Sequence, residues 1–265
     1  MQSTKTDEEN SSLQPVFLSD VELYYSEKVR GKQIEITGEE CHHIKDVMRH
    51  KVDDEIYVTD GLGTIYHSKI LGISKNKIEC QSFSSTQYEN KLGKVTFCVP
   101  RMKSSDRFEF ALEKSVELGI TNFIVFESKR TIAKGEKIDR WQKVLTSAMK
   151  QSLRSWLPKI SYAKSIGEII KQNGTKILFD QNSDKTFQSI LNSQLTIGNC
   201  FFIFGPEGGF EKGELRIDPL RLTSCEARNG ACADEGGELQ IRLTENRLRS
   251  ETAIVTAASM LAMNV

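Results

Sequence analysis

The stretch that decides the fold is Phe201-Phe202-Ile203-Phe204-Gly205-Pro206-Glu207-Gly208-Gly209-Phe210. Its first four residues form a short apolar run, which is typical of a buried strand, and a glycine-rich turn follows at once. In an open α/β sheet, ligands bind at the carboxyl ends of the strands, where such turns lie. The three glycines permit positive φ and a close approach of the backbone to a ligand. Taken alone, the turn is equally compatible with a purely structural role.

The sequence on both sides of this stretch alternates strand-like and helix-like patterns. Apolar runs predict strands at Val95–Val99, Asn122–Glu127, Lys176–Asp180, Cys200–Phe204 and Leu239–Leu243. Helical spacing of apolar residues predicts helices at Ser105–Leu118, Asp139–Leu153 and Glu251–Met263. Buried strands that alternate with helices indicate an α/β domain with a mostly parallel sheet. Residues 215–238 show no clear period and contain one proline and three glycines, so we expect a long loop or insertion there.

The N-terminal third has a different pattern. Short alternating runs predict strands at Gln33–Thr37, Glu55–Asp60, Thr64–Ile70 and Lys77–Gln81, which a small β-barrel would close. One helix is expected at Glu39–Arg49, where Ile44, Val47 and Met48 have helical spacing. The polar segment 89–94 marks a domain boundary. We therefore expect a disordered acidic tail at 1–15, a β-rich domain at 16–89 and an α/β domain at 94–265.

Composition narrows the class of protein. No apolar run reaches the length of a membrane span, and the N-terminus lacks the pattern of a secretion signal. The six cysteines form no Cys-x-x-Cys pair, so we expect no metal site and reduced thiols in a cytoplasm. The net charge is zero, but residues 128–164 hold ten lysines and arginines against two acids. This stretch is either a phosphate-contacting patch or a solvated helix face.

A second segment, Leu248-Arg249-Ser250-Glu251-Thr252-Ala253, begins the last predicted helix, with Ser250 placed to cap it. It is either a capped helix start with an exposed ion pair or part of a ligand site. The chain contains neither a P-loop nor the Gly-x-Gly-x-x-Gly fingerprint of dinucleotide-binding folds.

The two segments together resemble the RsmE family of 16S ribosomal RNA uridine N3-methyltransferases, within the knotted SPOUT superfamily. That family carries a Gly-Pro-Glu-Gly-Gly-Phe/Leu loop and a later Leu-Gly-x-Arg-Ile-Leu-Arg-Thr/Ala-Glu-Thr segment. Residues 103–119, 130–158 and 46–49 are similar to further parts of the family pattern, so the resemblance covers about residues 16–265. The chain departs from the pattern at Lys150, Leu153, Thr244, Asn246 and Arg247.

This resemblance implies a SPOUT methyltransferase domain with a trefoil knot, preceded by a PUA-like β-barrel that binds RNA. It also implies a homodimer that acts on 16S rRNA in the small ribosomal subunit. The implied cofactor is S-adenosylmethionine, held at Leu178, Phe179, Asp180, Phe204, Gly205, Pro206, Glu207, Gly208, Gly209, Leu243, Asn246, Leu248 and Thr252. RNA contacts are expected from Arg49, Lys51, Lys103, Arg130 and Arg154.

Methylation of uridine N3 requires alignment of donor and acceptor and loss of the N3 proton. We expect Arg249 to stabilise the anion that develops on the uracil edge and Glu251 to orient it. Two alternatives stay open at this stage. One is a non-catalytic RNA-binding factor for ribosome assembly, and the other is a SPOUT methyltransferase that acts on a different RNA.

Overall fold

The computed structural model describes residues 21–131, 133–192, 198–211 and 238–265. The chain divides into two compact units, Met1–Tyr88 and Glu89–Val265, and each is described by itself. The expected N-terminal tail at 1–15 lies outside the described residues, as does all but the last residue of the expected insertion at 215–238.

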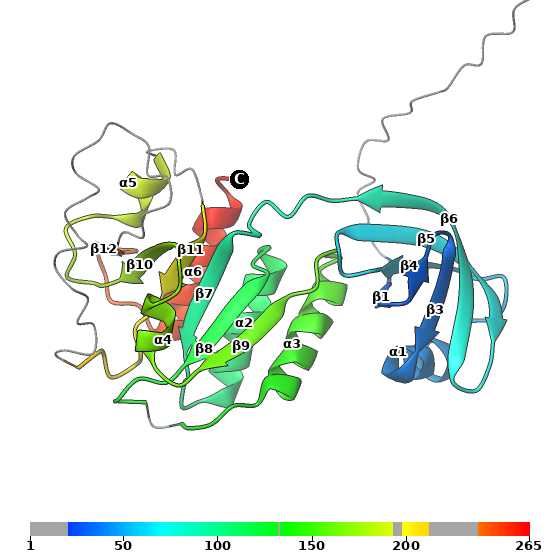
Figure 1. The fold of residues 1–265 in the computed structure, drawn as a ribbon, viewed down its shortest axis with the longest axis horizontal. Helices are drawn as coiled ribbons and strands as arrows, with labels where there is room; N and C mark the ends of the chain where they lie inside the picture. Colours follow the sequence, from blue (N-terminus) through cyan, green and yellow to red (C-terminus); the bar gives the residue numbers. More distant parts are fainter. Residues whose placement is uncertain (1–20, 132, 193–197, 212–237) are drawn as a thin grey trace, which may run out of the picture. The chain divides into compact units, whose positions relative to one another are not determined.

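The N-terminal unit is built on one six-stranded sheet with the order β1-β4-β5-β6-β3-β2 (Figure 1). All neighbouring strands pair antiparallel except β1 and β4, which are parallel. The strands are β1 Leu23–Tyr25, β2 Val29–Arg30, β3 Gln33–Thr37, β4 Glu55–Thr59, β5 Thr64–Ile73 and β6 Lys77–Gln87. The four predicted strands are present, and β5 and β6 extend beyond their predicted ends.

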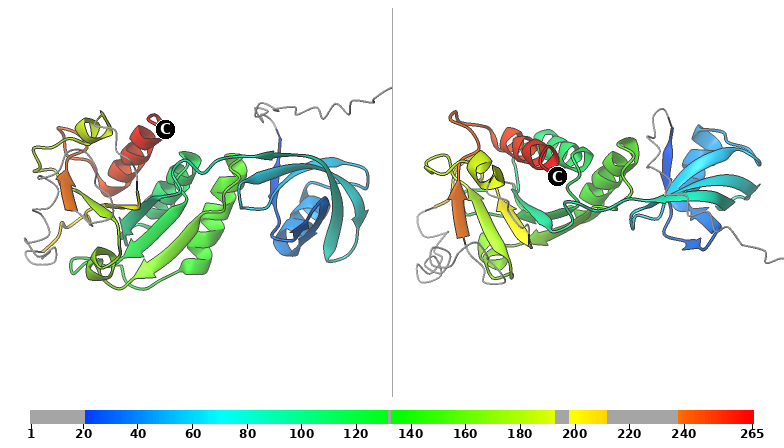
Figure 2. Two further views of the ribbon diagram at one scale, coloured as in Figure 1. Left: turned by 45° about the horizontal axis from the view of Figure 1, so that its top comes forward. Right: turned by 90° about the horizontal axis from the view of Figure 1, so that it is seen from above.

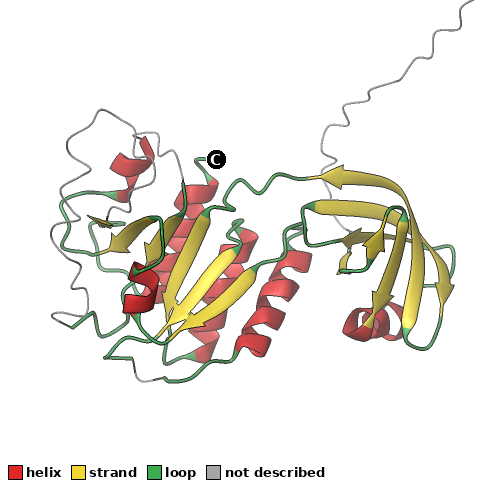
Figure 3. Ribbon diagram, in the orientation of Figure 1, coloured by secondary structure: helices red, strands yellow, loops and turns green. Residues whose placement is uncertain are grey.

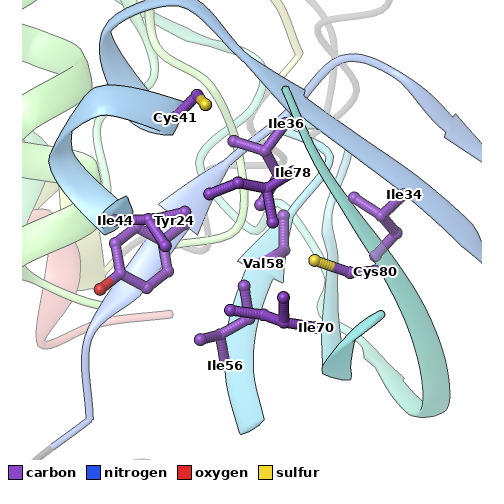
Figure 4. Close-up of a cluster of buried hydrophobic side chains, with 10 residues drawn as sticks. All are labelled: Tyr24, Ile34, Ile36, Cys41, Ile44, Ile56, Val58, Ile70, Ile78 and Cys80. Atoms are coloured by element: carbon purple, nitrogen blue, oxygen red, sulfur yellow. The ribbon is translucent and has the colours of Figure 1, made fainter. Parts of the chain in front are cut away.

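Alternation of apolar and polar residues places one face of each strand in the core of this unit. Ile34 and Ile36 of β3, Ile56 and Val58 of β4, and Ile70 of β5 are all at most 2% exposed. Figure 4 shows these side chains converging with others from β1, β6 and the helical segment. Apolar residues at every second position therefore face the core, and the polar residues between them face solvent.

The helical segment of this unit differs from the single helix predicted at Glu39–Arg49. An α-helix, α1, spans Gly38–His42 and continues as a π-helix, η1, over His43–Val47. Of the three residues with helical spacing only Ile44 is buried, whereas Val47 and Met48 are 56% and 38% exposed. The wider π turn rotates the later residues away from the core, and Arg49 then ends the segment with φ at 61°.

The C-terminal unit contains a six-stranded sheet with the order β12-β10-β11-β7-β8-β9, in which every pairing is parallel. Its strands are β7 Val95–Pro100, β8 Asn122–Phe126, β9 Lys159–Ala163, β10 Thr175–Phe179, β11 Cys200–Ile203 and β12 Glu238–Ile241. Its helices are α2 Ser105–Glu117, α3 Ile138–Gln151, α4 Ile166–Ile170, α5 Phe187–Asn192 and α6 Ser250–Ala262.

Helices cover both faces of this sheet. The ribbon views place α2, α3 and α6 on one face and α4 on the other (Figures 1 and 2). Figure 3 shows the same layers by element type, with yellow strands between red helices. Ile166 and Ile169 of α4 pack against sheet residues such as Cys98 and Phe201. The predicted α/β class with a mostly parallel sheet is confirmed.

The strand β12 lies beside β10, although β11 precedes it in the chain, so the connection crosses from one side of β10 to the other. That connection runs through residues 212–237, outside the described residues, and the expected trefoil knot stays a prediction. The sequence patterns miss five short elements, namely β1, β2, β9, α4 and α5. None exceeds six residues, which is too short for a clear period.

Candidate functional site

A cavity of about 1010 Å³ opens at the carboxyl ends of β10, β11 and β12. This is the edge at which α/β sheets bind ligands. The loops after these strands, the start of α6 and one residue of α2 form its wall. The lining residues are Arg107, Leu178, Phe179, Asp180, Gln181, Asn182, Phe204, Gly205, Pro206, Glu207, Gly209, Phe210, Glu211, Leu243, Thr244, Asn246, Arg247, Leu248, Arg249, Ser250 and Ala253.

The glycine-rich loop after β11 is a tight turn held from outside. The Gly209 amide donates to the Pro206 carbonyl at 2.8 Å, and Gly209 adopts φ of 68°, which favours glycine. Nη1 of Arg130 donates to the Gly208 carbonyl at 2.8 Å. A Cβ added to Gly208 would lie 3.3 Å from Cβ of Arg130, so a side chain there would crowd this contact. The loop is therefore clamped by a residue that follows β8.

The glycine-rich loop is also tied to the last helix. Oγ of Ser250 donates to the Gly205 carbonyl at 3.1 Å. The prediction that Ser250 caps α6 is wrong, because Arg249 holds the N-cap position and Ser250 is the first helical residue. No side-chain hydrogen bond caps this helix. The hydroxyl is used instead to join the two sequence segments that carry the family resemblance.

The loop after β10 supplies a fixed carboxylate and an aromatic floor. Oδ1 of Asp180 accepts from the Asn182 amide at 3.0 Å, and the Asp180 amide donates to the Ile241 carbonyl at 2.8 Å. The rings of Phe179 and Phe204 stack with centroids 4.8 Å apart. Asp180 is thus anchored through both its side chain and its backbone.

The segment between β12 and α6 contains three departures from the family pattern, namely Thr244, Asn246 and Arg247. Oγ1 of Thr244 donates to the Asn246 carbonyl at 2.7 Å, so the hydroxyl closes a local turn. Both residues line the cavity, as does Arg247. The departures therefore change the wall of the cavity itself.

Arg107 of α2 reaches the same cavity from a different part of the sequence. Its Nε lies 3.7 Å from Oε1 of Glu251, the second residue of α6. The Glu251 side chain is 12% exposed and the Arg107 side chain is 47% exposed. Oε2 of Glu251 is buried and has no hydrogen-bond partner in the described part of the chain. This ion pair joins α2 and α6, which pack against each other.

Eleven of the thirteen predicted cofactor residues line the cavity, and the exceptions are Gly208 and Thr252. Gly208 is used in the Arg130 contact, and Thr252 is exposed on α6. Of the predicted catalytic pair, Arg249 lines the cavity, whereas Glu251 lies behind the wall beside Arg107. Three further lining residues, Phe210, Thr244 and Arg247, lie within the loops Gly205–Phe210 and Leu243–Leu248 at which the resemblance places the donor. The lining residues outside the predicted ones are Arg107, Gln181, Asn182, Glu211, Ser250 and Ala253. Most directly adjoin predicted residues, whereas Arg107 lies in the segment 103–119, which resembles the family pattern but did not mark Arg107 as a site residue.

The predicted RNA-binding residues fall into two groups. Arg49, Lys51 and Lys103 are exposed, the first two on the N-terminal unit. Arg130 and Arg154 are also exposed, but each donates to a backbone carbonyl within its own unit. Nη2 of Arg154 lies 2.6 Å from the Glu117 carbonyl at the end of α2, which is a structural contact.

The basic stretch 128–164 is partly neutralised within the fold. Nζ of Lys134 pairs with Glu127 at 3.1 Å, and Nε of Arg140 pairs with Glu109 at 2.7 Å. The Tyr162 hydroxyl donates to Glu127 at 2.5 Å. Burial, followed by this bond to the carboxylate, raises the pKa of Tyr162 to about 12. Burial acts to raise the pKa of Glu127, but the bonds from Tyr162, Gly135 and Lys134 outweigh it and lower that pKa.

The described residues contain no group of three or more His, Cys, Asp or Glu side chains that could hold a metal ion. Cys41, Cys80, Cys98 and Cys200 are buried free thiols, and burial raises the pKa of all four. No helix among the described ranges is long and apolar enough to span a membrane.

Known RNA methyltransferases are similar to this chain over both of its units. A model for an RNA methyltransferase domain matches residues 88–218, and a model for an RNA methyltransferase PUA domain matches residues 36–81. Ribosomal RNA small subunit methyltransferase E of Bacillus subtilis is 26% identical, with 91% of this chain and 94% of that protein covered. The protein of the same name from Rickettsia conorii is 27% identical, with coverage of 90% and 93%.

The fold has a close counterpart among solved structures. The crystal structure of a ribosomal RNA small subunit methyltransferase E from Neisseria gonorrhoeae, bound to S-adenosyl methionine, matches with a TM-score of 0.73 at 24% identity. The match covers 92% of this chain and 97% of that one. The family resemblance expected from the two motif segments is confirmed, and the chain belongs to the RNA methyltransferase family with a PUA domain, of the RsmE type.

Proposed function

We propose that this protein transfers a methyl group from S-adenosylmethionine to N3 of one specific uridine in the 16S rRNA of the small ribosomal subunit. One observation carries the proposal. The two segments that resemble the family motifs meet through the Ser250–Gly205 hydrogen bond, and both line one cavity at the carboxyl ends of three parallel strands. The relatives that share most of the chain's length carry the corresponding name.

The residues of the cavity fit the donor. S-adenosylmethionine would bring a methyl group on a cationic sulfonium, together with an ammonium group and an adenine. Asp180, Glu207 and Glu211 place three carboxylates in the lining, which favour a cation. The apolar side chains of Leu178, Phe204 and Leu248 offer a surface for a planar base. A volume of about 1010 Å³ also leaves room for an acceptor base beside the donor.

The chain's own residues must hold the acceptor and manage its charge. Loss of the N3 proton leaves negative charge on the uracil edge, and methyl transfer to N3 then removes it. Arg249 is exposed at the N-cap of α6 and lines the cavity, so its guanidinium stabilises that charge as it develops. Because α6 begins at Ser250, the positive end of the helix dipole points the same way. Glu251 is buried behind Arg107 and acts by orientation.

The N-terminal unit and the exposed basic residues would hold the RNA. Arg49, Lys51 and Lys103 are available for phosphate contacts, and binding that rests on such contacts weakens steeply with salt. We propose in addition that the protein works as a homodimer in the cytoplasm. Sedimentation at several concentrations tests the dimer, and a monomer at assay concentration would exclude it.

The test is direct transfer of labelled methyl to RNA. Purified protein is incubated with labelled S-adenosylmethionine and either free 16S rRNA or assembled small subunits, and the product nucleosides are identified by mass spectrometry. We expect N3-methyluridine at one position. Label on ribose or on transfer RNA would instead indicate a related methyltransferase. If calorimetry shows no binding of S-adenosylmethionine, the protein is a non-catalytic RNA-binding factor.

A further inference from the structure

The acidic and the basic residues that line the cavity come from different elements of the fold. The carboxylates of Asp180, Glu207 and Glu211 come from the loops that follow β10 and β11. The guanidinium groups of Arg107, Arg247 and Arg249 come from α2 and from the segment that leads into α6. The first set favours a cationic donor, whereas the second favours an anion. Arg249 is itself a predicted site residue and Arg247 adjoins others, whereas Arg107 is brought in by the packing of α2 on α6.

The backbone of Arg107 is fixed in α2, while its guanidinium group stays accessible to a ligand. The Ser104 side chain caps α2 by accepting from the Arg107 amide at 3.4 Å, which fixes Arg107 in the first turn of the helix. Its Nε is 3.7 Å from Glu251 Oε1, an ion pair beyond ordinary hydrogen-bond distance. Within the described ranges this guanidinium makes no hydrogen bond, so its donors are open to another acceptor. Its side chain is 47% exposed, so an incoming group can reach it.

Glu251 is the fixed partner in this pair. Its side chain is 12% exposed, and Oε2 is buried without a hydrogen-bond partner among the described residues. A carboxylate with an unpartnered buried oxygen is costly for stability, so its position calls for a functional reason. The second residue of a helix is a favourable place for a carboxylate, which lessens that cost. From there it draws the flexible Arg107 side chain toward the cavity wall.

We propose that Arg107, oriented by Glu251, binds a backbone phosphate of the RNA beside the target base. A guanidinium matches the geometry of a phosphate through two parallel hydrogen bonds. Phosphate contacts fix the register of a nucleic acid without reading its sequence. Arg107 would therefore fix the position of the acceptor base relative to the donor. This inference rests on the proposed function and adds to it a subsite for the acceptor.

S-adenosylmethionine also carries a carboxylate. The test must therefore distinguish an Arg107 that binds this carboxylate from an Arg107 that binds an RNA phosphate. The Kd for S-adenosylmethionine is measured by calorimetry, and the Kd for substrate RNA by fluorescence anisotropy with S-adenosylhomocysteine present. For Arg107→Ala we expect the RNA Kd and the KM for RNA to rise about tenfold or more, with the donor Kd changed less than twofold. The slope of log K against log salt should fall by roughly one phosphate contact, about 0.7 to 0.9. Arg107→Lys should recover part of the affinity.

Arg140→Ala is the matched control, because Arg140 pairs with Glu109 across α2 and α3 and does not line the cavity. It should leave RNA affinity and salt slope unchanged. Glu251→Gln should raise the RNA Kd severalfold in the wild-type background but add little to Arg107→Ala, since the two residues act as one unit. Independent, additive effects would overturn the positioning role of Glu251.

Two results would overturn the phosphate subsite. One is a raised Kd for S-adenosylmethionine with an unchanged Kd for RNA in Arg107→Ala, which would show that Arg107 binds the methyl donor. The other is a folded Arg107→Gln, without the charge, that binds RNA with unchanged affinity and salt slope, which would make the Arg107–Glu251 pair a structural link. The RNA measurement does not depend on turnover. A protein that binds RNA through Arg107 but transfers no methyl would contradict the proposed function and leave this subsite standing.

Discussion

The Ser250 hydroxyl donates a 3.1 Å hydrogen bond to the Gly205 carbonyl, although 45 residues separate the two in the chain. This bond ties the start of α6 to the glycine-rich loop after β11. Arg130 holds the same loop from the other direction through the Gly208 carbonyl. These two hydrogen bonds hold the loop from two different elements, and they favour the shape that it has around the cavity.

Ser250→Ala should weaken donor binding by removing the link between loop and helix. A lost neutral hydrogen bond corresponds to about 1 kcal/mol, or roughly a fivefold rise in the Kd for S-adenosylmethionine by calorimetry. Ser259→Ala is the matched control, because the Ser259 hydroxyl bonds to the Val255 carbonyl within α6 and is not among the lining residues. An equal effect of both substitutions would show that the change acts through the helix rather than the loop.

Arg130→Ala tests whether this arginine serves the loop or the RNA. The 2.8 Å bond to Gly208 predicts a rise of about fivefold in the donor Kd, because the unbound loop gains conformational freedom. Lys159→Ala, in the same basic stretch, should leave the donor Kd unchanged. If Arg130→Ala raises only the KM for RNA, the residue is a phosphate contact and the clamp has no role in donor binding.

Arg249→Ala should reduce turnover strongly and leave the donor Kd nearly intact. Removal of one donor to a developing anion typically lowers the rate constant about a hundredfold or more. Single-turnover transfer of labelled methyl, with protein in excess over RNA, isolates the chemical step. An unchanged rate would exclude Arg249 from charge stabilisation.

Tyr162→Phe should reduce stability in a pH-dependent way. The hydrogen bonds that Glu127 accepts lower the pKa of its carboxyl in the folded protein. Their contribution to the free energy of unfolding is therefore present above the unfolded pKa of Glu127 and is lost as pH falls through its folded pKa. Tyr162 has a folded pKa raised from 10.0 to about 12, so its contribution is full below pH 10 and is lost between those values. Denaturant unfolding should give a deficit of about 1 kcal/mol at pH 7, since the pair is only partly screened.

The size of that deficit should vary with pH in two windows. It should shrink as the pH falls below about 4.5, the ordinary pKa of Glu127, and again as the pH rises above about 10, that of Tyr162. Tyr57→Phe, in the N-terminal unit, is a control for loss of a tyrosine hydroxyl, because the Tyr57 hydroxyl makes no hydrogen bond within the described part of the chain. A deficit that is constant from pH 3 to pH 11 would contradict the charge-assisted bond.

The sequence by itself determined the features that depend on local pattern. The apolar runs at β7, β8, β10 and β11 and the helical spacing in α2 and α6 are strong periodic signals, and they settled the α/β class. The Gly205–Phe210 loop and the Leu248–Thr252 segment led to the family. Ligand sites in such sheets lie at the strand ends, so the loops after β10, β11 and β12 were correctly expected to lie together.

The tertiary structure alone decided which distant residues meet at those loops. Arg107 is an ordinary polar residue on an amphipathic helix, and only the packing of α2 against α6 brings it to the cavity. Ser250 has the sequence context of a cap, but the nearby Gly205 carbonyl takes its hydroxyl instead. The edge strand β9 is short and half exposed, and pairing with β8 supplies its hydrogen bonds. Such contacts depend on how far-separated segments pack, which local propensity does not encode.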